Sequence, residues 1–282
     1  MIDLDAISRA DGCFEPLPTS ATRLASLVAD EIPDVVRIVE VVTYDQALTA
    51  ALLRRANSSW SASRSEITTV KDAVVRIGAG PVVALALGVN VRTRLMGAIP
   101  AYGLAEGDLW NHSVAATLAA ECLMRVAPRR LPTETPTAAL LHDVGKLVMA
   151  RFGDEESLAA IEAVRAAGAT RMQAEAEVLG VDHAQLGGMV ARAWRLPDSL
   201  VAGIERHHAT KGQAHADSAV LIAYAVHLAD VVAKAVGAGA ADNAELETFA
   251  RAMGELGLSA DDYDSVCRLV ADRFVEVTSQ FV

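Results

Sequence analysis

The residues with the clearest capacity for chemistry in this chain are its histidines and a few of its aspartates. His142 and Asp143 are adjacent, as are His207 and His208, and Asp230 lies inside the most apolar segment. A neutral imidazole and a carboxylate are both good ligands for borderline or hard divalent metals. Their pairing therefore predicts a site for one or two divalent ions, with Fe, Mn or Zn as the expected metal.

Asp230 carries the strongest single signal. An unpaired carboxylate inside an apolar helix costs several kcal/mol, so it requires a cation, a metal ion or a hydrogen-bond network. A lone histidine is more often a packed or surface residue than a ligand, and we interpret His215 and His227 in that way. His227 lies three residues before Asp230, so it could also support the site from a nearby helix face.

The elements that must position these residues are expected to be helices. Hydrophobic residues make up 52% of the chain and aromatic residues only 4%, so the core must be built from Ala, Leu, Val and Ile. No segment shows a convincing strand-like alternation. The expected helices are Thr43 to Ala56, Thr69 to Gly78, Pro81 to Met96, Asp108 to Ala127, Thr135 to Ala150, a helix that opens at Asp182, Pro197 to His208, Ser218 to Val236, and one or two more after residues 237–241.

Capping signals mark several of these helix ends. Thr43-Tyr-Asp-Gln46 and Asp182-His-Ala-Gln185 predict capping boxes. Asp108 is expected to cap the helix that runs to Ala127. Asn57 is expected to end the helix from Thr43 to Ala56 rather than to form a contact site.

Glycine and proline interrupt the helical pattern between residues 97 and 107, which predicts a boundary there. The expected organisation is an N-terminal helical part at 1–100, a helical bundle with the metal site at 101–236, and a C-terminal helical extension at 237–282.

Charge argues against a nucleic-acid partner. The formal net charge is -11, and a nucleic-acid binder usually shows a basic stripe. The short basic pairs Arg54-Arg55 and Arg129-Arg130 are interpreted as solvated helix ends.

The remaining compositional signals are consistent with a cytoplasmic location. The three cysteines are far apart and form no CxxC pair, which favours reduced thiols. The acidic start at Met1 to Asp5 does not resemble a signal peptide. The best apolar run, Ile77 to Val91, is shorter than a membrane span and contains Gly-Pro, so no membrane association is expected.

The order of His112, His142-Asp143 and Asp230 resembles the HD superfamily of metal-dependent phosphohydrolases. His183 and the His207-His208 pair are similar to the extra ligands of its HD-GYP branch. Further motifs resemble the HDOD domain, an HD-related output domain, over roughly residues 14 to 236. These motifs are Pro16-Leu-Pro18, Ala47 to Leu53, Ala56-Asn-Ser58, Asp72 to Gly78, Trp110-Asn-His-Ser113, Leu140 to Lys146, Ala193-Trp194, Leu196-Pro197 and His207-His208.

The resemblance implies an all-α fold in which an N-terminal helical subdomain packs on an HD-type helical bundle. It implies a full set of metal ligands: His112, His142, Asp143, His183, His207, His208 and Asp230. HD-GYP enzymes carry Glu after the His-His pair and a later Gly-Tyr-Pro. Here Ala209 follows His208 and no Gly-Tyr-Pro occurs, so hydrolysis of cyclic di-GMP is not expected.

Two functions stay open at this point. The first is a regulatory signal-transduction module that acts by binding a signalling protein or a small phosphorylated ligand. The alternative is a metal-dependent phosphohydrolase in which bound metal activates water. Lys146 would then stabilise a phosphate oxygen, although it could instead form an ion pair with a nearby carboxylate. The sequence leaves the oligomeric state open.

Overall fold

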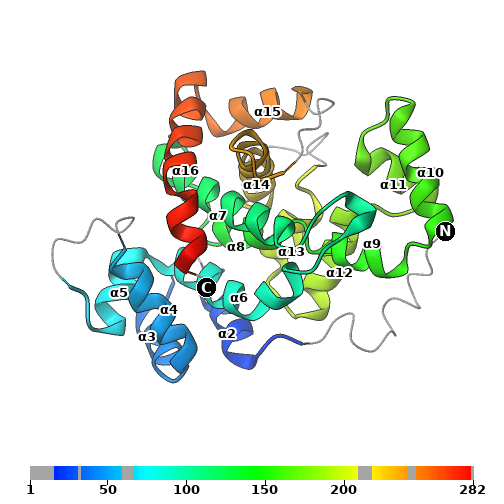
Figure 1. Cartoon of the computed structure of the whole chain (residues 1–282). Helices are drawn as coiled ribbons and strands as arrows, with labels where there is room; N and C mark the ends of the chain where they lie inside the picture. The colour runs from blue at the N-terminus through cyan, green and yellow to red at the C-terminus, as the bar shows by residue number, and fades with distance from the viewer. Residues whose placement is uncertain (1–15, 31–32, 59–65, 209–217, 240–245, 281–282) are drawn as a thin grey trace.

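The computed structural model describes residues 16–30, 33–58, 66–208, 218–239 and 246–280, with side chains up to residue 274. Within these ranges the chain is helical and forms no strand; Ile99 and Leu104 form one isolated bridge. The all-α prediction is confirmed. Figure 1 shows the first helices at one end of the molecule, against a larger group that contains the remaining helices.

The helices of the N-terminal part pack around α6 and α5. In chain order they are α2 (Thr19–Val28), α3 (Val35–Thr43), α4 (Gln46–Ala56), α5 (Val70–Ile77) and α6 (Ala79–Leu95). The contacts join α2 to α6, α4 to α5 and α6, and α3 to α5. The buried face of α4 consists of Leu48, Ala51, Leu52, Arg55 and Ala56.

Three helix starts differ from expectation. Asp45, not Thr43, caps α4, because Thr43 still belongs to α3 and its hydroxyl bonds Val39 O. The second difference is at α6, which begins at Ala79, two residues before Pro81. In this first turn Gly80 lies so close to Thr133 that an added Cβ would sit 2.0 Å from the Thr133 carbonyl oxygen. Asp108 is the first helical residue of α7 and accepts a bond from Ala105 N instead of capping.

Asn57 ends α4 as predicted. Its side-chain amide also bonds both the N–H and the carbonyl of Ile67, at 2.7 and 2.8 Å. Asn57 therefore fixes local structure.

The candidate ligands lie on a group of helices that is built on the contact between two long helices, α7 and α14. In chain order, the elements of this part are η2 (Pro100–Tyr102), α7 (Asp108–Val126), α8 (Thr135–Leu141), α9 (Gly145–Phe152), α10 (Glu155–Ala166), α11 (Arg171–Leu179), α12 (His183–Ala193), α13 (Asp198–Glu205) and α14 (Ser218–Ala235). Both capping-box partners predicted at Asp182 and Gln185 are present at the start of α12.

The helix expected from Thr135 to Ala150 is wrong as a single element. It divides into α8 and α9, and the break falls on residues 142–144. Gly145 begins α9 directly against α12, where an added Cβ would lie 1.9 Å from His183 O. This close packing redirects the chain at the His-Asp pair, which a continuous helical pattern does not reveal.

Sequence reasoning missed α2 and α3 in the N-terminal part of the chain. It also missed α10 and α11. Their starts carry clear signals: Asp154 accepts from Ser157 N, and Thr170 and Gln173 form a capping box. The stretch has only a short buried face, which made its helices hard to recognise.

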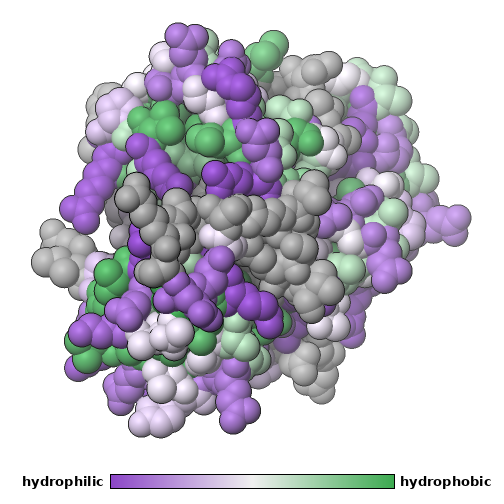
Figure 2. Space-filling view, turned by 60° about the vertical axis from the view of Figure 1, so that its left-hand side comes forward, coloured by the Kyte–Doolittle hydropathy of each residue, from purple (hydrophilic) through white to green (hydrophobic). Residues whose placement is uncertain are grey.

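Among the described residues, α14 has the length and hydropathy of a membrane span, but 67% of it is buried inside the structure. It therefore serves as a core helix here. The C-terminal helices are α15 (Leu246–Leu256) and α16 (Ala260–Gln280), and α16 packs along α7 and touches α4. On the face drawn in Figure 2, hydrophilic side chains predominate with smaller hydrophobic patches between them.

The prediction that the Arg54-Arg55 pair is solvated is wrong for Arg55. Its side chain is buried, and Arg55 Nη2 bonds both carboxylate oxygens of Glu121 at 2.9 and 2.8 Å. Arg54 is exposed, as expected. The Arg55–Glu121 ion pair joins α4 to α7 and is a buried link between the N-terminal helices and the ligand-bearing helices.

Candidate metal centre

The structure brings all seven predicted ligands together from five regions of the chain. His112 comes from α7, the His-Asp pair from the break between α8 and α9, and His183 from the first residue of α12. The His-His pair follows the end of α13, and Asp230 projects from α14. They form three overlapping groups whose ligand atoms lie within 4.8 Å of one another: His112, His142 and Asp230; His142, Asp143 and His207; His183, His207 and His208.

Four of the imidazoles are held at their Nδ1 atoms by oxygen acceptors. His112 Nδ1 lies 2.6 Å from Ala238 O, His142 Nδ1 2.8 Å from Ala139 O, and His207 Nδ1 2.7 Å from Ile204 O. His183 Nδ1 lies 2.6 Å from a Glu175 carboxylate oxygen. Because these oxygens only accept, each Nδ1 carries a proton, and a ring in its neutral form presents its Nε2 lone pair to the cluster.

The Nε2 atoms then meet one another. His112 Nε2 lies 3.1 Å from His142 Nε2, and His183 Nε2 lies 3.2 Å from His208 Nε2. Two lone pairs repel at that distance unless a proton or a cation lies between them. Ligand nitrogens about 2.0–2.1 Å from one ion are spaced at roughly this distance from each other.

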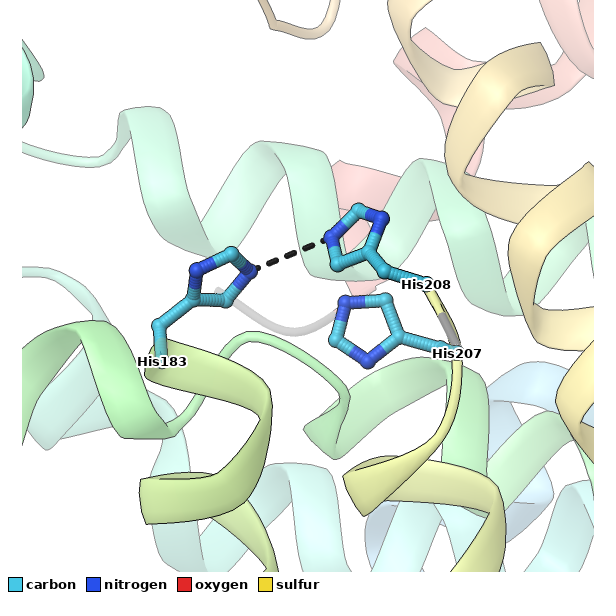
Figure 3. A group of neighbouring side chains, drawn as sticks. All are labelled: His183, His207 and His208. Atoms are coloured by element: carbon cyan, nitrogen blue, oxygen red, sulfur yellow. Dashed lines mark hydrogen bonds between the residues drawn. The ribbon is translucent and has the colours of Figure 1, made fainter. Parts of the chain in front are cut away.

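His207 gives a separate sign of a missing cation partner. Its Nε2 is buried and has no hydrogen-bond partner among the described residues. An unsatisfied buried polar atom is costly, and a metal ion would satisfy it. Figure 3 shows the His183, His207 and His208 rings turned toward one another from two elements.

Asp143 lies between the two ends of the cluster. Its Oδ2 is 3.4 Å from His112 Nε2 and from His142 Nε2, whereas its Oδ1 is 3.5 Å from His183 Nε2. The two carboxylate oxygens therefore face different groups of histidines. This arrangement suits a carboxylate that bridges two ions as well as one that binds a single central ion.

The electrostatics favour positive charge at this place. Burial lowers the pKa of His142, but the Asp143 and Asp230 carboxylates outweigh it and raise that pKa to about 9. Burial also raises the pKa of both carboxyl groups, yet the neighbouring histidines and lysines hold them well below their usual range. Burial and neighbouring imidazoles lower the pKa of His207 and His208, so both stay neutral.

Glu175 and Tyr102 are site residues that sequence reasoning missed. Glu175 is fully buried and accepts bonds from His183 N, His183 Nδ1 and the Tyr102 hydroxyl. Burial raises its pKa, but the His183 ring and these bonds lower it to about 2. No spacing rule links Glu175 to His183, because the contact depends on how α11 packs on α12.

A cavity of about 110 Å³ opens over the candidate ligands. Its lining includes five of them and four cationic side chains: Lys146, Arg165, Arg171 and Lys234. Lys146 Nζ lies 2.5 Å from Asp143 Oδ2, so the ion pair considered for it in the sequence is present. Lys234 Nζ pairs in the same way with Asp230, at 2.7 Å.

His227 is buried in α14, with its ring 6.2 Å from the ring of His208. It belongs to none of the three ligand groups. His215 lies outside the described residues.

Comparisons with known proteins identify the family and the fold of this chain. The HDOD domain profile matches residues 14–210. The solved structure of an HDOD domain protein of unknown function from Geobacter sulfurreducens gives a TM-score of 0.73 at 21% identity, covering 98% of this chain and 95% of that one. A Shewanella amazonensis structure, provisionally described as a phosphohydrolase, gives a TM-score of 0.68 at 26% identity and covers 99% of this chain and 97% of that one.

Two further relatives bear on the extent of the likeness. A Marinobacter aquaeolei structure, provisionally described as a signal transduction protein, gives a TM-score of 0.70 at 24% identity and covers 95% of this chain and 60% of that one. An uncharacterized protein of Treponema pallidum is 22% identical in an alignment 214 residues long, which covers 68% of this chain and 41% of that protein. This chain thus spans less than half of the curated relative it matches.

Proposed function

We propose, from the premise that this chain belongs to the HDOD family, that it is a signal-transduction module whose metal centre binds a small phosphorylated ligand. The observation that carries the proposal is the set of Nε2 lone pairs that converge beneath a cavity lined by cations. Lone pairs suit a metal ion, and cations suit an anionic ligand beside it.

The residues that would hold metal form two groups, one at each end of the cluster. His112, His142 and Asp230 form one end, His183, His207 and His208 form the other, and Asp143 lies between them. A bound divalent ion would polarise a phosphate oxygen and lower the pKa of bound water. Iron, manganese and zinc all accept this mixture of imidazole and carboxylate donors.

The protein's own side chains would orient the ligand. The amino groups of Lys146 and Lys234 lie beside Asp143 and Asp230 and line the cavity, so both can donate to phosphate oxygens. The Tyr102 hydroxyl donates to Glu175, which in turn fixes the His183 ring. Burial and the Glu175 charge raise the Tyr102 pKa well above its usual value, so the hydroxyl keeps its proton.

The position of Tyr102 favours a regulatory role. It lies in η2, on the segment that connects α6 to α7, and its ring lines the cavity. A ligand in the cavity would therefore touch the connection to the N-terminal helices. Those helices expose Val36, Tyr44 and Val75, which are 78%, 85% and 67% exposed and suit contact with a partner protein.

Calorimetry with inorganic phosphate tests this proposal. Protein loaded with Mn²⁺ should bind phosphate, and metal-free protein should bind it at least tenfold more weakly. Lys146→Gln should also weaken binding, whereas Lys71→Gln, an exposed lysine on α5 away from the cavity, should not. Equal phosphate binding with and without metal would contradict the proposal.

A metal-dependent phosphohydrolase is the second candidate. It is favoured by the cavity, which gives a ligand direct access to candidate metal ligands and to Lys146. Cyclic di-GMP is disfavoured as a substrate, because about 110 Å³ is far below the roughly 300–1,000 Å³ of pockets for drug-sized ligands. Multiple turnovers of a phosphate ester, lost in the His142→Ala/Asp143→Ala variant, would establish the enzymatic alternative.

A further inference from the structure

Two arginines line the cavity in addition to the two lysines that pair with candidate metal ligands. Arg165 lies in the last turn of α10 and Arg171 is the first residue of α11. Their side chains are 34% and 18% exposed. Neither belongs to a candidate ligand group, so metal binding does not account for them. We refer to Arg165 and Arg171 as the mouth arginines.

The mouth arginines share a single carboxylate. Glu162 Oε2 lies 3.0 Å from Arg165 Nη1, and Glu162 Oε1 lies 2.7 Å from Arg171 Nη2. Both guanidinium groups bring positive charge to the cavity that they line. Arg171 and Met172 open α11 and both line the cavity, so the positive end of this nine-residue helix adds to that charge.

The Tyr102 ring lies near one of the mouth arginines and near Lys146. The Arg171 guanidinium carbon lies 4.6 Å from the Tyr102 ring centroid, and Lys146 Nζ lies 5.6 Å from the same centroid. Lys146 is tied to the candidate ligand Asp143, whereas Arg171 is tied to Glu162. One small cavity therefore offers two sets of cations: one is tied to candidate metal ligands and the other to Glu162.

We infer that the mouth arginines form a second anion subsite, and that the ligand is a compact molecule with a phosphate at one end and a carboxylate or second phosphate at the other. The inference rests on the proposed binding of phosphate at the metal centre. Guanidinium groups bind carboxylates and phosphates through charge-assisted, often bidentate hydrogen bonds. The cavity volume of about 110 Å³ limits the distance between the two anionic groups.

Two probes that differ at one end test the inference. 3-Phosphoglycerate carries a phosphate and a carboxylate, whereas glycerol 3-phosphate carries the phosphate and a neutral hydroxymethyl group. We expect the Mn²⁺-loaded protein to bind 3-phosphoglycerate at least tenfold more tightly, as one charge-assisted contact provides. The Arg165→Gln/Arg171→Gln variant should reduce that ratio to about one and leave glycerol 3-phosphate binding within about twofold.

Arg192→Gln is the matched control, because Arg192 pairs with Glu205 on the surface and does not line the cavity. It should keep the wild-type ratio. Retained glycerol 3-phosphate binding also shows that a variant is folded. A wild-type ratio near one, or an unchanged ratio in the double variant, would overturn the second subsite while the proposed function stood. If the wild type bound neither phosphate compound in a metal-dependent way, the proposed function itself would be overturned.

Discussion

The directions of four of the five imidazole rings in the candidate metal centre depend on the groups that accept their Nδ1 protons. Backbone carbonyls accept the Nδ1–H bond of three histidines, and the Glu175 carboxylate accepts that of His183. The Glu175 bond is a charge-assisted one and also makes the ring a better donor to a metal. Glu175 is thus a positioning residue that acts through His183.

Replacing Glu175 with Gln should weaken metal binding by about 10–100-fold, the usual effect of losing such a partner. Glu177→Gln on the same helix is the matched control, because Glu177 is exposed. Competition with a fluorescent chelator measures both affinities. Equal affinities in the two variants would show that Glu175 does not act through His183.

Protons and metal should compete at His142. In metal-free protein its pKa is raised to about 9, so this proton stabilises the folded state below the ordinary pKa near 6.5 and the benefit is lost as pH rises through 9. Metal must displace the same proton, so metal affinity should rise by up to about tenfold per pH unit below pH 9. The difference in Tm between Mn²⁺-loaded and metal-free protein should therefore widen from pH 6.5 to 8.5. A difference that narrows would contradict this assignment.

At the level of elements, the break between α8 and α9 is what lets adjacent residues serve one site. Consecutive residues on a continuous helix point about 100° apart. With Gly145 pressed against α12, the chain turns at residues 142–144, and both His142 and Asp143 contribute to the ligand groups.

Gly145→Ala should therefore push α9 away from α12, because its Cβ would lie 1.9 Å from His183 O and 2.5 Å from Gly187 N. We expect a loss of about 1–3 kcal/mol in the free energy of unfolding, as for other overpacked sites, together with weaker metal binding. Gly254→Ala, within α15 and open on all sides, should be neutral or stabilising. Denaturant unfolding of the two variants decides, and a neutral Gly145→Ala would refute the packing argument.

The sequence predicted most helices and all seven members of the cluster, because periodicity, capping residues and histidine doublets are local signals. It missed helices α2, α3, α10 and α11. It also did not predict the break at the His-Asp pair or the roles of Tyr102 and Glu175. Those features depend on contacts between elements far apart in the chain, such as Gly145 with His183. Arg55 was misjudged for the same reason, since its partner Glu121 lies on another helix.

At the scale of the whole molecule, Arg55 and Glu121 join the N-terminal helices to α7, the helix that carries His112. The side chains are 6% and 5% exposed. Removing one partner of such a pair leaves an uncompensated buried charge, whereas replacing both with apolar residues does not.

Arg55→Met should therefore cost about 3–5 kcal/mol, and Arg55→Met/Glu121→Leu should recover most of that loss. Denaturant midpoints of the two variants test this. If the double variant were as unstable as the single one, the pair would matter for more than its charge balance.

The most direct test of the account is the metal content of protein purified without chelator or nickel resin, measured by inductively coupled plasma mass spectrometry. We predict one or two equivalents of Fe, Mn or Zn in the wild type, with a lower Tm after chelation, because an ion that binds only the folded state stabilises it. The His142→Ala/Asp143→Ala variant should contain none. A wild-type protein that holds no metal, even after reconstitution, would contradict the account and make the cluster a hydrogen-bonded polar core.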